Sequence, residues 1–188
     1  DSAIHRMHED LLSLDVPAVF MGHLPSRAID SVTFDDHGGC YAVGKYFAEA
    51  GYKRVFHVTG PSAFQQAIVR QRGFEQGFSE HGGVVDDALR YEGTYLVPSG
   101  YEAVEWLLRE HSRAMPDAIF FANSLMARGG LAALHDHGLQ SPRDVALAIN
   151  KAKGPGTAEA LSGRSIACIA GLSIRHASCV SAQVVSPP

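Results

Sequence analysis

The sequence has few cysteines, no long apolar run and no excess of positive charge. No apolar stretch reaches the roughly 20 residues that a membrane-spanning helix needs, so no membrane partner is expected. The three cysteines, Cys40, Cys168 and Cys179, form neither a Cys-x-x-Cys pair nor an even-numbered framework. Reduced thiols in a cytoplasm are the simplest explanation. A net charge of −4 argues against a chain that binds polyanions with its whole surface.

Common enzyme signatures are also missing. The sequence contains no Gly-x-Gly-x-x-Gly, no phosphate-binding loop that ends in Gly-Lys-Ser/Thr, and no Gly-x-Ser-x-Gly. Asp35 and Asp36 have the chemistry for Mg²⁺, but a turn or N-cap role better explains two adjacent acids before Gly-Gly. His135 and His137 are two residues apart on a predicted helix, so they face different directions and cannot chelate one ion. We therefore expect no enzyme activity, no metal site and no cofactor.

Short apolar runs alternate with helical patterns along most of the chain. The runs are apolar throughout rather than at every second residue, which is typical of parallel strands covered on both faces. Right-handed crossovers of this length predict an α/β fold, a doubly wound parallel sheet with helices on both faces. Strands are predicted at 16–22, 31–35, 53–60, 89–93, 117–122 and 144–149, and helices at 38–51, 65–81, 98–111 and within 120–134.

Capping residues predict where two of the helices begin. Ser99 is the predicted N-cap of the helix at 98–111, and Glu102 completes a capping box three residues later. Ser124 fits best as the N-cap of the following helix. Asn123, one residue earlier, is then free to point out of the strand end towards a ligand. The alternative, that Asn123 only satisfies loop backbone groups, fits the local pattern equally well.

In open parallel sheets, ligands bind beyond the carboxyl ends of the strands. The side chains predicted at that edge include an amide, an aromatic ring, hydroxyls and carboxylates. Such a set suits a small polar ligand such as a sugar, a nucleoside or an organic acid. The residues are Gly22-His23, Asp35-Asp36-His37, Gly60-Pro61-Ser62, Thr94-Tyr95 and Asn123-Ser124.

Residues 150–188 differ in composition from the rest of the chain. All nine phenylalanines, six tyrosines and the single tryptophan lie within residues 1–149. The remainder is dominated by alanine, serine and glycine, which bury little apolar area to offset the entropy of ordering. Two interpretations stay open, a flexible extension or a segment that is not the native continuation of the fold, and we favour the second. "SIACIAGLSI" (165–174) is the exception, because it has the composition to add a strand to a sheet edge.

Five stretches in order resemble the LacI/GalR bacterial transcription regulators, whose effector cores typically read "V..D...G...A...L...GH..I..I.G". The likeness covers roughly residues 10–149. The stretches are "SVTFDDHGGCYAVGKYFAEAGYKRVFHVTGP" (31–61), "AIVRQRGFEQGF" (67–78), "EGTYLVPSGYEAVEWLL" (92–108), "AIFFANSLMARGGLAALHDHGL" (118–139) and "SPRDVALA" (141–148).

The resemblance implies roles for individual residues. Arg70 falls on the family's effector-binding arginine, whose guanidinium suits vicinal hydroxyls or a carboxylate; the alternative is an exposed helix arginine. Tyr95 falls on the aromatic that packs on a sugar or base face, and Asn123 on an asparagine that holds a ligand hydroxyl. Gln66, one turn before Arg70, is expected to face the same cleft. His23 stands where members place a polar contact from the other lobe.

The resemblance also implies an organisation. Residues 1–36 correspond to a remnant of the amino-terminal lobe, 37–149 to the carboxyl-terminal lobe of a periplasmic-binding-protein-like core, and 150–188 to an atypical tail. Returning strands of the first lobe and the helix-turn-helix that reads DNA are expected to be absent from this chain. The parent is expected to be a cytoplasmic, homodimeric repressor that senses a sugar or nucleoside-like effector. A periplasmic solute-binding protein of an ABC importer, which shares the fold and cleft, is the alternative.

Overall fold

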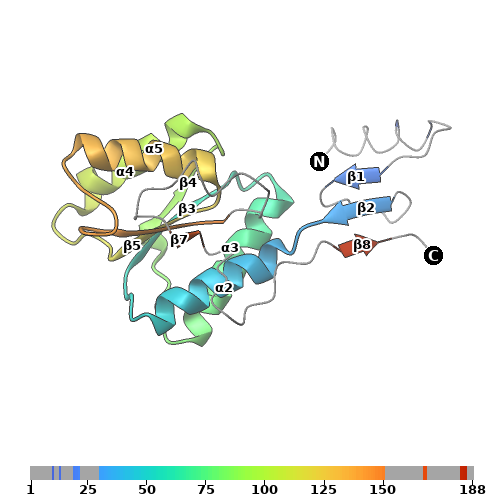
Figure 1. Cartoon of the computed structure of the whole chain (residues 1–188), viewed down its shortest axis with the longest axis horizontal. Coiled ribbons are helices and arrows are strands. Elements are labelled where there is room, and N and C mark those ends of the chain that lie inside the picture. Colours follow the sequence, from blue (N-terminus) through green and yellow to red (C-terminus); the bar gives the residue numbers. More distant parts are fainter. Residues whose placement is uncertain are drawn as a thin grey trace. The chain divides into compact units, whose positions relative to one another are not determined.

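The structure, a computed structural model, describes residues 34–150 in full. Elsewhere it describes two single residues and the backbone of four short strands, namely Asp10, Ser13 and residues 19–21, 30–33, 167–168 and 183–185. The chain divides into two compact units, residues 1–35 with 181–188 and residues 36–180. Each unit contains its own sheet (Figure 1). None of the helices within the described residues combines the length and apolar character of a membrane span.

The first unit contains a three-stranded sheet in the order β1-β2-β8. Strands β1 (Val19–Met21) and β2 (Asp30–Thr33) are parallel and overlap the strands predicted at 16–22 and 31–35. Strand β8 (Gln183–Val185) pairs antiparallel with β2. The sequence predicted no returning strand for this lobe within the chain, and β8 corrects that expectation. Its two valines are β-branched and therefore suit a strand.

The second unit contains a sheet in the order β4-β3-β5-β6-β7, and every pair in it is parallel. The doubly wound parallel sheet that the apolar runs predicted is confirmed. Strand β7 falls within 165–174, the stretch that had the composition to add a strand. The strands are β3 (Val55–Thr59), β4 (Arg90–Glu92), β5 (Ala118–Phe121), β6 (Ala146–Ile149) and β7 (Ala167–Cys168).

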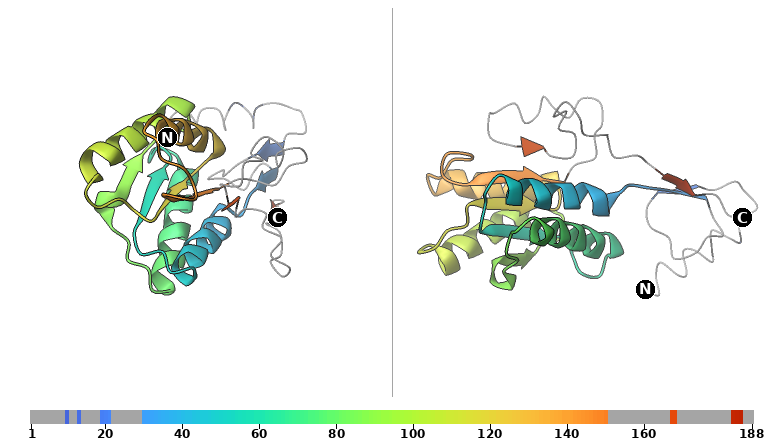
Figure 2. Two further views of the ribbon diagram at one scale, coloured as in Figure 1. Left: turned by 60° about the vertical axis from the view of Figure 1, so that its left-hand side comes forward. Right: turned by 90° about the horizontal axis from the view of Figure 1, so that it is seen from below.

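Two pairs of helices cover the two faces of this sheet. Helices α2 (Asp36–Glu49) and α3 (Gln65–Glu80) pack together on one face. Helices α4 (Val97–His111) and α5 (Ser124–Asp136) pack together on the other. Figure 1 shows the sheet between the two pairs, and the right-hand view of Figure 2, from below, has α2 and α3 in front. A short 3-10 helix, Asp87–Leu89, precedes β4.

The two cores explain why the strands are apolar at every position. Successive strand residues point to opposite faces, so a strand covered on both sides must be apolar throughout. On β5, Ala118 and Phe120 belong to the core beneath α2 and α3, whereas Ile119 and Phe121 belong to the core beneath α4 and α5. All four are fully buried. Strands β3 and β6 contribute to both cores in the same alternating way.

Each helix pair relies on glycine for its close approach. A Cβ added at Gly77 of α3 would collide with the carbonyl oxygen of Tyr41 on α2. A Cβ added at Gly100 of α4 would collide with the carbonyl oxygen of Met126 on α5. The obstacles are backbone atoms, which cannot rotate away. Both pairs therefore depend on residues without side chains at the helix crossing.

Helix α4 begins earlier than the sequence predicted. It starts at Val97, with Pro98 in its first turn, a position where proline is well tolerated. The Ser99 hydroxyl lies inside the helix, where it donates to the carbonyl of the residue before the helix and accepts from the N–H of Thr94, both at 3.0 Å. The predicted capping box of Ser99 and Glu102 is therefore wrong. The serine instead fixes the loop that leads into the helix.

Candidate functional site

The carboxyl ends of β3 and β5 lie side by side, and the helices that follow them lie on opposite faces of the sheet. Helix α3 leaves β3 towards one face, and α5 leaves β5 towards the other. This is the topological switch point of a doubly wound sheet, where the loops diverge and ligands bind. Residues from α2, α3 and the loops after β4 and β5 meet at this point.

The side chain of Asp36, the first residue of α2, connects two polar side chains of α3. Its Oδ1 accepts a hydrogen bond from Arg70 Nε at 2.8 Å, and its Oδ2 accepts one from Gln66 Nε2 at 3.0 Å. Gln66 and Arg70 are four residues apart on α3 and therefore share a face, as predicted. Only 4% of the Asp36 side chain is exposed. Its position at a helix N-terminus also favours a negative charge.

Arg70 is held from two sides. Besides Asp36, its Nη1 donates to the backbone carbonyl of Ala122, at the end of β5, at 2.9 Å. The side chain is 16% exposed, so the alternative of an exposed helix arginine is wrong. These bonds use two of the five guanidinium N–H groups, which leaves three that a ligand can engage. The ligand role of Arg70 stays a prediction.

Tyr95 lies beside this arginine in an unusual backbone conformation. Its φ of 67° is in the left-handed region, which is uncommon for a residue other than glycine. Its ring centroid is 5.9 Å from Arg70 Cζ, and the ring packs so closely on Gly60 that a Cβ there would collide with it. The Tyr95 hydroxyl oxygen is buried and has no hydrogen-bond partner among the described residues. Burial, the largest influence, raises the pKa of this hydroxyl.

Asn123 is the N-cap of α5, which corrects the prediction that Ser124 has this role. Its Oδ1 accepts from the backbone N–H of Met126 at 2.9 Å, and its Nδ2 donates to the backbone carbonyl of Tyr95 at 2.8 Å. The sequence predicted a free side chain, but Asn123 instead connects the start of α5 to the Tyr95 loop. The sequence left two interpretations of Asn123 open. Both contacts are to backbone groups, which favours the interpretation that Asn123 satisfies the loop backbone. A ligand contact through the second N–H stays a prediction.

The remaining predicted site residue, His23, lies outside the described residues. Sequence reasoning in turn missed the role of Asp36, which it assigned to a turn or cap. Arg70, the partner of Asp36, is 34 residues away in the sequence, so no local sequence pattern predicts the pair. The signals in the sequence were two adjacent acids before a predicted helix and their predicted position at the ligand-binding edge of the sheet.

Three exposed apolar side chains follow the carboxyl ends of β3, β4 and β5, one after each strand. They are Phe64, Leu96 and Leu125, with exposures of 51%, 58% and 42%. The Phe64 ring also lies 6.3 Å from that of Tyr95. The edge of the sheet at which Asp36, Gln66 and Arg70 meet thus also presents apolar surface, the usual mixture in a small-molecule site.

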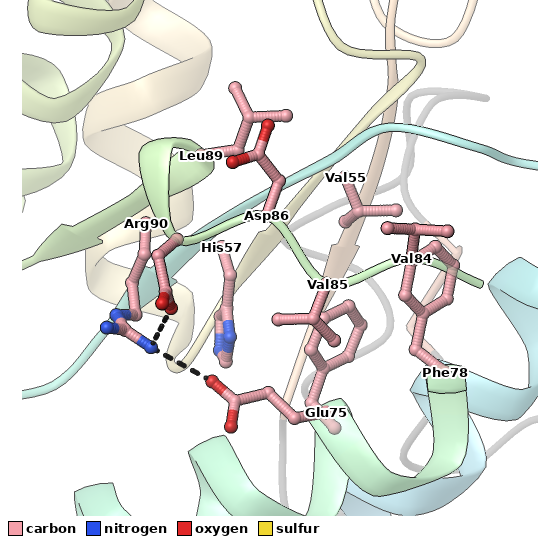
Figure 3. Close-up of a pocket in the computed structure, with 11 residues that line it drawn as sticks. Val55, His57, Glu75, Phe78, Val84, Val85, Asp86, Leu89 and Arg90 are labelled. Carbon is pink, nitrogen blue, oxygen red and sulfur yellow. Dashed lines mark hydrogen bonds and ion pairs between the residues drawn. The ribbon is translucent and has the colours of Figure 1, made fainter. Parts of the chain in front are cut away.

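A second polar group contains His57 of β3, Arg90 of β4 and Glu75 of α3 (Figure 3). The His57 ring, 4% exposed, contacts the rings of Phe74 and Phe120 at centroid distances of 4.7 and 4.8 Å, and these two rings also contact each other. Burial, and to a smaller extent the charge of Arg90, lowers the pKa of His57 to about 3. Arg90 is itself paired with Glu75 at 3.2 Å. The described residues contain no group of three His, Cys, Asp or Glu side chains that could hold a metal ion.

Known proteins resemble this chain in sequence. A family model described as "Periplasmic binding protein-like domain" matches residues 45–153. The HTH-type transcriptional repressor PurR of Haemophilus influenzae (strain ATCC 51907) is 32% identical over 142 residues, which cover 73% of this chain and 41% of the relative. PurR of Escherichia coli O1:K1 is 30% identical over 134 residues, 70% of this chain and 39% of the relative. The chain thus spans about two fifths of these relatives' length.

Solved structures of LacI-type regulators have the same fold as this chain. A putative LacI regulator from Bacillus cereus subsp. cytotoxis superposes with a TM-score of 0.69 at 25% identity, over 80% of this chain and 52% of that one. The fold also matches the transcriptional regulator CelR in its cellobiose complex, with a TM-score of 0.66 at 22% identity over 78% of this chain and 52% of that one. This chain belongs to the periplasmic binding protein-like domain family and, within it, to the effector-binding cores of LacI/GalR regulators.

Proposed function

We propose that this chain is the effector-binding portion of a LacI/GalR-type transcriptional repressor that senses a small polar ligand, a sugar or a nucleoside. The observation that carries the proposal is the placement of Arg70 at the switch point. The guanidinium is fixed by Asp36 and by the Ala122 carbonyl, and three N–H groups are left for a ligand. A fixed donor loses little entropy when the ligand binds. No reaction is part of this proposal.

The surroundings of Arg70 suit a ring that carries several hydroxyls. The N–H groups of Arg70, with the amide of Gln66 close by, are donors for hydroxyl oxygens. The Tyr95 ring and the exposed Phe64 beside it offer apolar faces against which a sugar or base packs. Asn123 holds the Tyr95 loop in place through a 2.8 Å hydrogen bond. In this proposal Asn123 acts on the ligand chiefly through Tyr95.

The rest of the proposed mechanism lies in the parent protein. Effector binding shifts the balance between two conformations of the core, and the dimer transmits the change to two DNA-reading heads. DNA is bound through a helix-turn-helix domain outside this chain, and the parent works as a cytoplasmic homodimer. The two PurR relatives are repressors by name, which supports this function over delivery of a solute to an importer.

Calorimetry with a panel of neutral ligands tests the proposal. Cellobiose, glucose, adenosine and inosine are titrated into the chain and into an Arg70→Lys variant. Lysine is preferable to alanine because it keeps the charge that neutralises buried Asp36, while it loses the planar fork. The variant is expected to bind ten- to hundredfold more weakly, about 1.5–3 kcal/mol for hydrogen bonds from a charged group.

Arg109→Lys is the matched control, because Arg109 on α4 is 67% exposed and pairs with its neighbour Glu110. It is expected to leave affinity unchanged. A chain that binds no member of the panel contradicts the proposed ligand class. Equal affinities of the wild type and Arg70→Lys, with unchanged circular dichroism, contradict the role of Arg70.

A further inference from the structure

The charge of Arg70 is already balanced inside the site. The Asp36 carboxylate is 4% exposed and contacts Arg70 Nε at 2.8 Å. The other side chains described around the pair, Gln66, Tyr95 and Asn123, are uncharged amides and a phenol whose pKa burial raises. The buried polar centre of the site thus contains one positive and one negative charge, and the exposed Asp35 next to it adds a second negative charge.

We propose that Asp36 makes this site selective for neutral, hydroxyl-bearing ligands and against anionic ones such as phosphorylated sugars, nucleotides and organic acids. The inference rests on the proposed function and deepens it. It removes organic acids from the ligand classes that the polar side chains at the sheet edge suggested. It also makes Asp36 a specificity-determining residue rather than a cap alone.

The geometry of the guanidinium supports this selectivity. Arginine recognises phosphate and carboxylate best with two parallel N–H bonds from one edge of its fork. In Arg70, Nε donates to Asp36 and Nη1 donates to the Ala122 carbonyl, so both flanks of the group already have an acceptor. The N–H groups that remain suit single hydroxyl acceptors. An anion that reaches them comes close to the Asp36 carboxylate, in a region where solvent screens repulsion poorly.

Removal of the Asp36 charge is therefore expected to create an anion site. Asp36→Asn keeps the size of the side chain and an oxygen that accepts from Arg70 Nε, but it leaves the arginine charge without a counterion. Inorganic phosphate is the probe, because it needs no knowledge of the natural effector. Its dissociation constant, measured by calorimetry at constant ionic strength, is expected to fall at least tenfold in the variant.

Two further variants locate the effect. In Asp36→Asn/Arg70→Gln the gain in phosphate affinity is expected to disappear, because the uncompensated cation is gone. Asp87→Asn is the matched control, since it also removes a carboxylate from an arginine, here Arg90 at 2.9 Å, at a side chain that is 78% exposed. Arg90 keeps Glu75 at 3.2 Å, so this control is expected to gain no phosphate affinity. If Asp36→Asn does not fold, Asp36→Ser takes its place, because serine also removes the charge and has a hydroxyl oxygen that can accept a hydrogen bond.

The outcomes separate this inference from the proposed function. A wild-type chain that binds phosphate as tightly as Asp36→Asn, with loss of binding in Arg70→Lys, overturns the inference and leaves a ligand role for Arg70 intact. A variant that gains nothing also overturns it. Glucose against glucose 6-phosphate, and adenosine against adenosine monophosphate, extend the test: the wild type is expected to prefer the neutral member, and Asp36→Asn to lose that preference by at least tenfold.

Discussion

The two faces of the five-stranded sheet differ in chemistry, although both are closed by a pair of helices in close contact. The core beneath α4 and α5 is built mainly from aliphatic side chains, with Phe56 and Phe121 on its strands. The core beneath α2 and α3 contains a run of stacked rings that includes His57. The buried carboxyl and imidazole groups of the described residues, Asp36 and His57, both contact α3.

The two faces of the sheet therefore depend on different kinds of interaction. An aliphatic core stabilises without directional demands, whereas a buried carboxylate or imidazole stabilises only while its surroundings satisfy it. Helix α3 carries Gln66 and Arg70 towards the site, and Phe74, four residues after Arg70, lies against His57. Substitutions on this face are therefore expected to depend on charge and pH, and those on the α4/α5 face on volume alone.

Loss of the buried ion pair is expected to have the largest effect. Asp36→Ala leaves the Arg70 charge, 16% exposed, without its partner, and should lower the free energy of unfolding by about 3–5 kcal/mol. Urea denaturation measures the change. Asp36→Ala/Arg70→Leu removes both charges and is expected to recover much of the loss. On the α4/α5 face, Glu110→Ala breaks an exposed pair with Arg109 and should change stability by less than about 1 kcal/mol. Equal losses at Asp36 and Glu110 would erase the distinction between the faces.

Both faces of the sheet are covered by helix pairs that cross at a glycine, and substitution of these glycines tests the close contact of each pair. Gly77→Ala on α3 and Gly100→Ala on α4 each place a methyl group against a backbone carbonyl, and each should lower the free energy of unfolding by about 1–3 kcal/mol. Gly39→Ala is the control within α2, because among the described residues its Cβ would meet only Asn150 Oδ1, at 3.8 Å. There alanine should stabilise by up to about 1 kcal/mol through helix propensity. A crossing glycine that tolerates alanine as well as Gly39 does contradicts the close contact of that pair.

The pH dependence of stability is expected to reside on the α2/α3 face. The folded-state pKa of His57, about 3, lies below its ordinary value of 6.5, so the folded protein resists protonation there. The stability associated with neutral His57 is complete above pH 6.5 and is lost as pH falls from 6.5 towards 3. One proton changes stability by about 1.4 kcal/mol per pH unit, so roughly 2 kcal/mol is lost by pH 5.

His57→Phe places a third phenylalanine beside Phe74 and Phe120 and removes the imidazole that accounts for this loss. Urea unfolding of the wild type and variant at pH 7.5 and pH 5 gives the difference, which is expected to shrink by about 2 kcal/mol in the variant. Phe120→Leu, a neutral change in the same core, should lower stability equally at both pH values. An unchanged acid sensitivity in His57→Phe would place the responsible group elsewhere.

The sequence predicted the architecture well because strands and helices of this kind have recognisable local sequence patterns. Strands covered on both faces are apolar throughout, and the helices between them show their periodicity, so the parallel doubly wound sheet followed from pattern alone. The ends of elements were less predictable. Ser99 and Ser124 are both good capping residues, but one lies inside α4 and the other follows the true cap, Asn123. Three-dimensional partners, the Thr94 loop and Tyr95, determine these roles.

The site was predicted in part for the same reason. Arg70 and Gln66 share a face by helical spacing, which a sequence shows. Their common partner Asp36 lies 30 to 34 residues away, on another helix, and only the fold brings it near. The left-handed backbone of Tyr95 is likewise invisible in a stretch that contains two better candidates, Gly93 and Gly100. The strand pattern placed Tyr95 at the edge of the sheet, and the family resemblance supplied its expected role, but neither predicted its backbone conformation.

The smallest effect compares two tyrosines that pack against the core beneath α4 and α5, one in the loop before α4 and one on α4 itself. Tyr95→Phe removes a buried hydroxyl that has no partner among the described residues, so it should raise the free energy of unfolding by about 0.5–1 kcal/mol. Tyr101→Phe on α4 removes a hydroxyl that donates to Asp136 at 3.1 Å, and it should lower stability by up to about 0.5 kcal/mol because the bond is exposed. Urea midpoints at pH 7.5 resolve shifts of opposite sign. A loss at both positions would mean that the Tyr95 hydroxyl already has a partner, such as a bound water, in the free protein. The strain at Tyr95 would then be confined to its backbone.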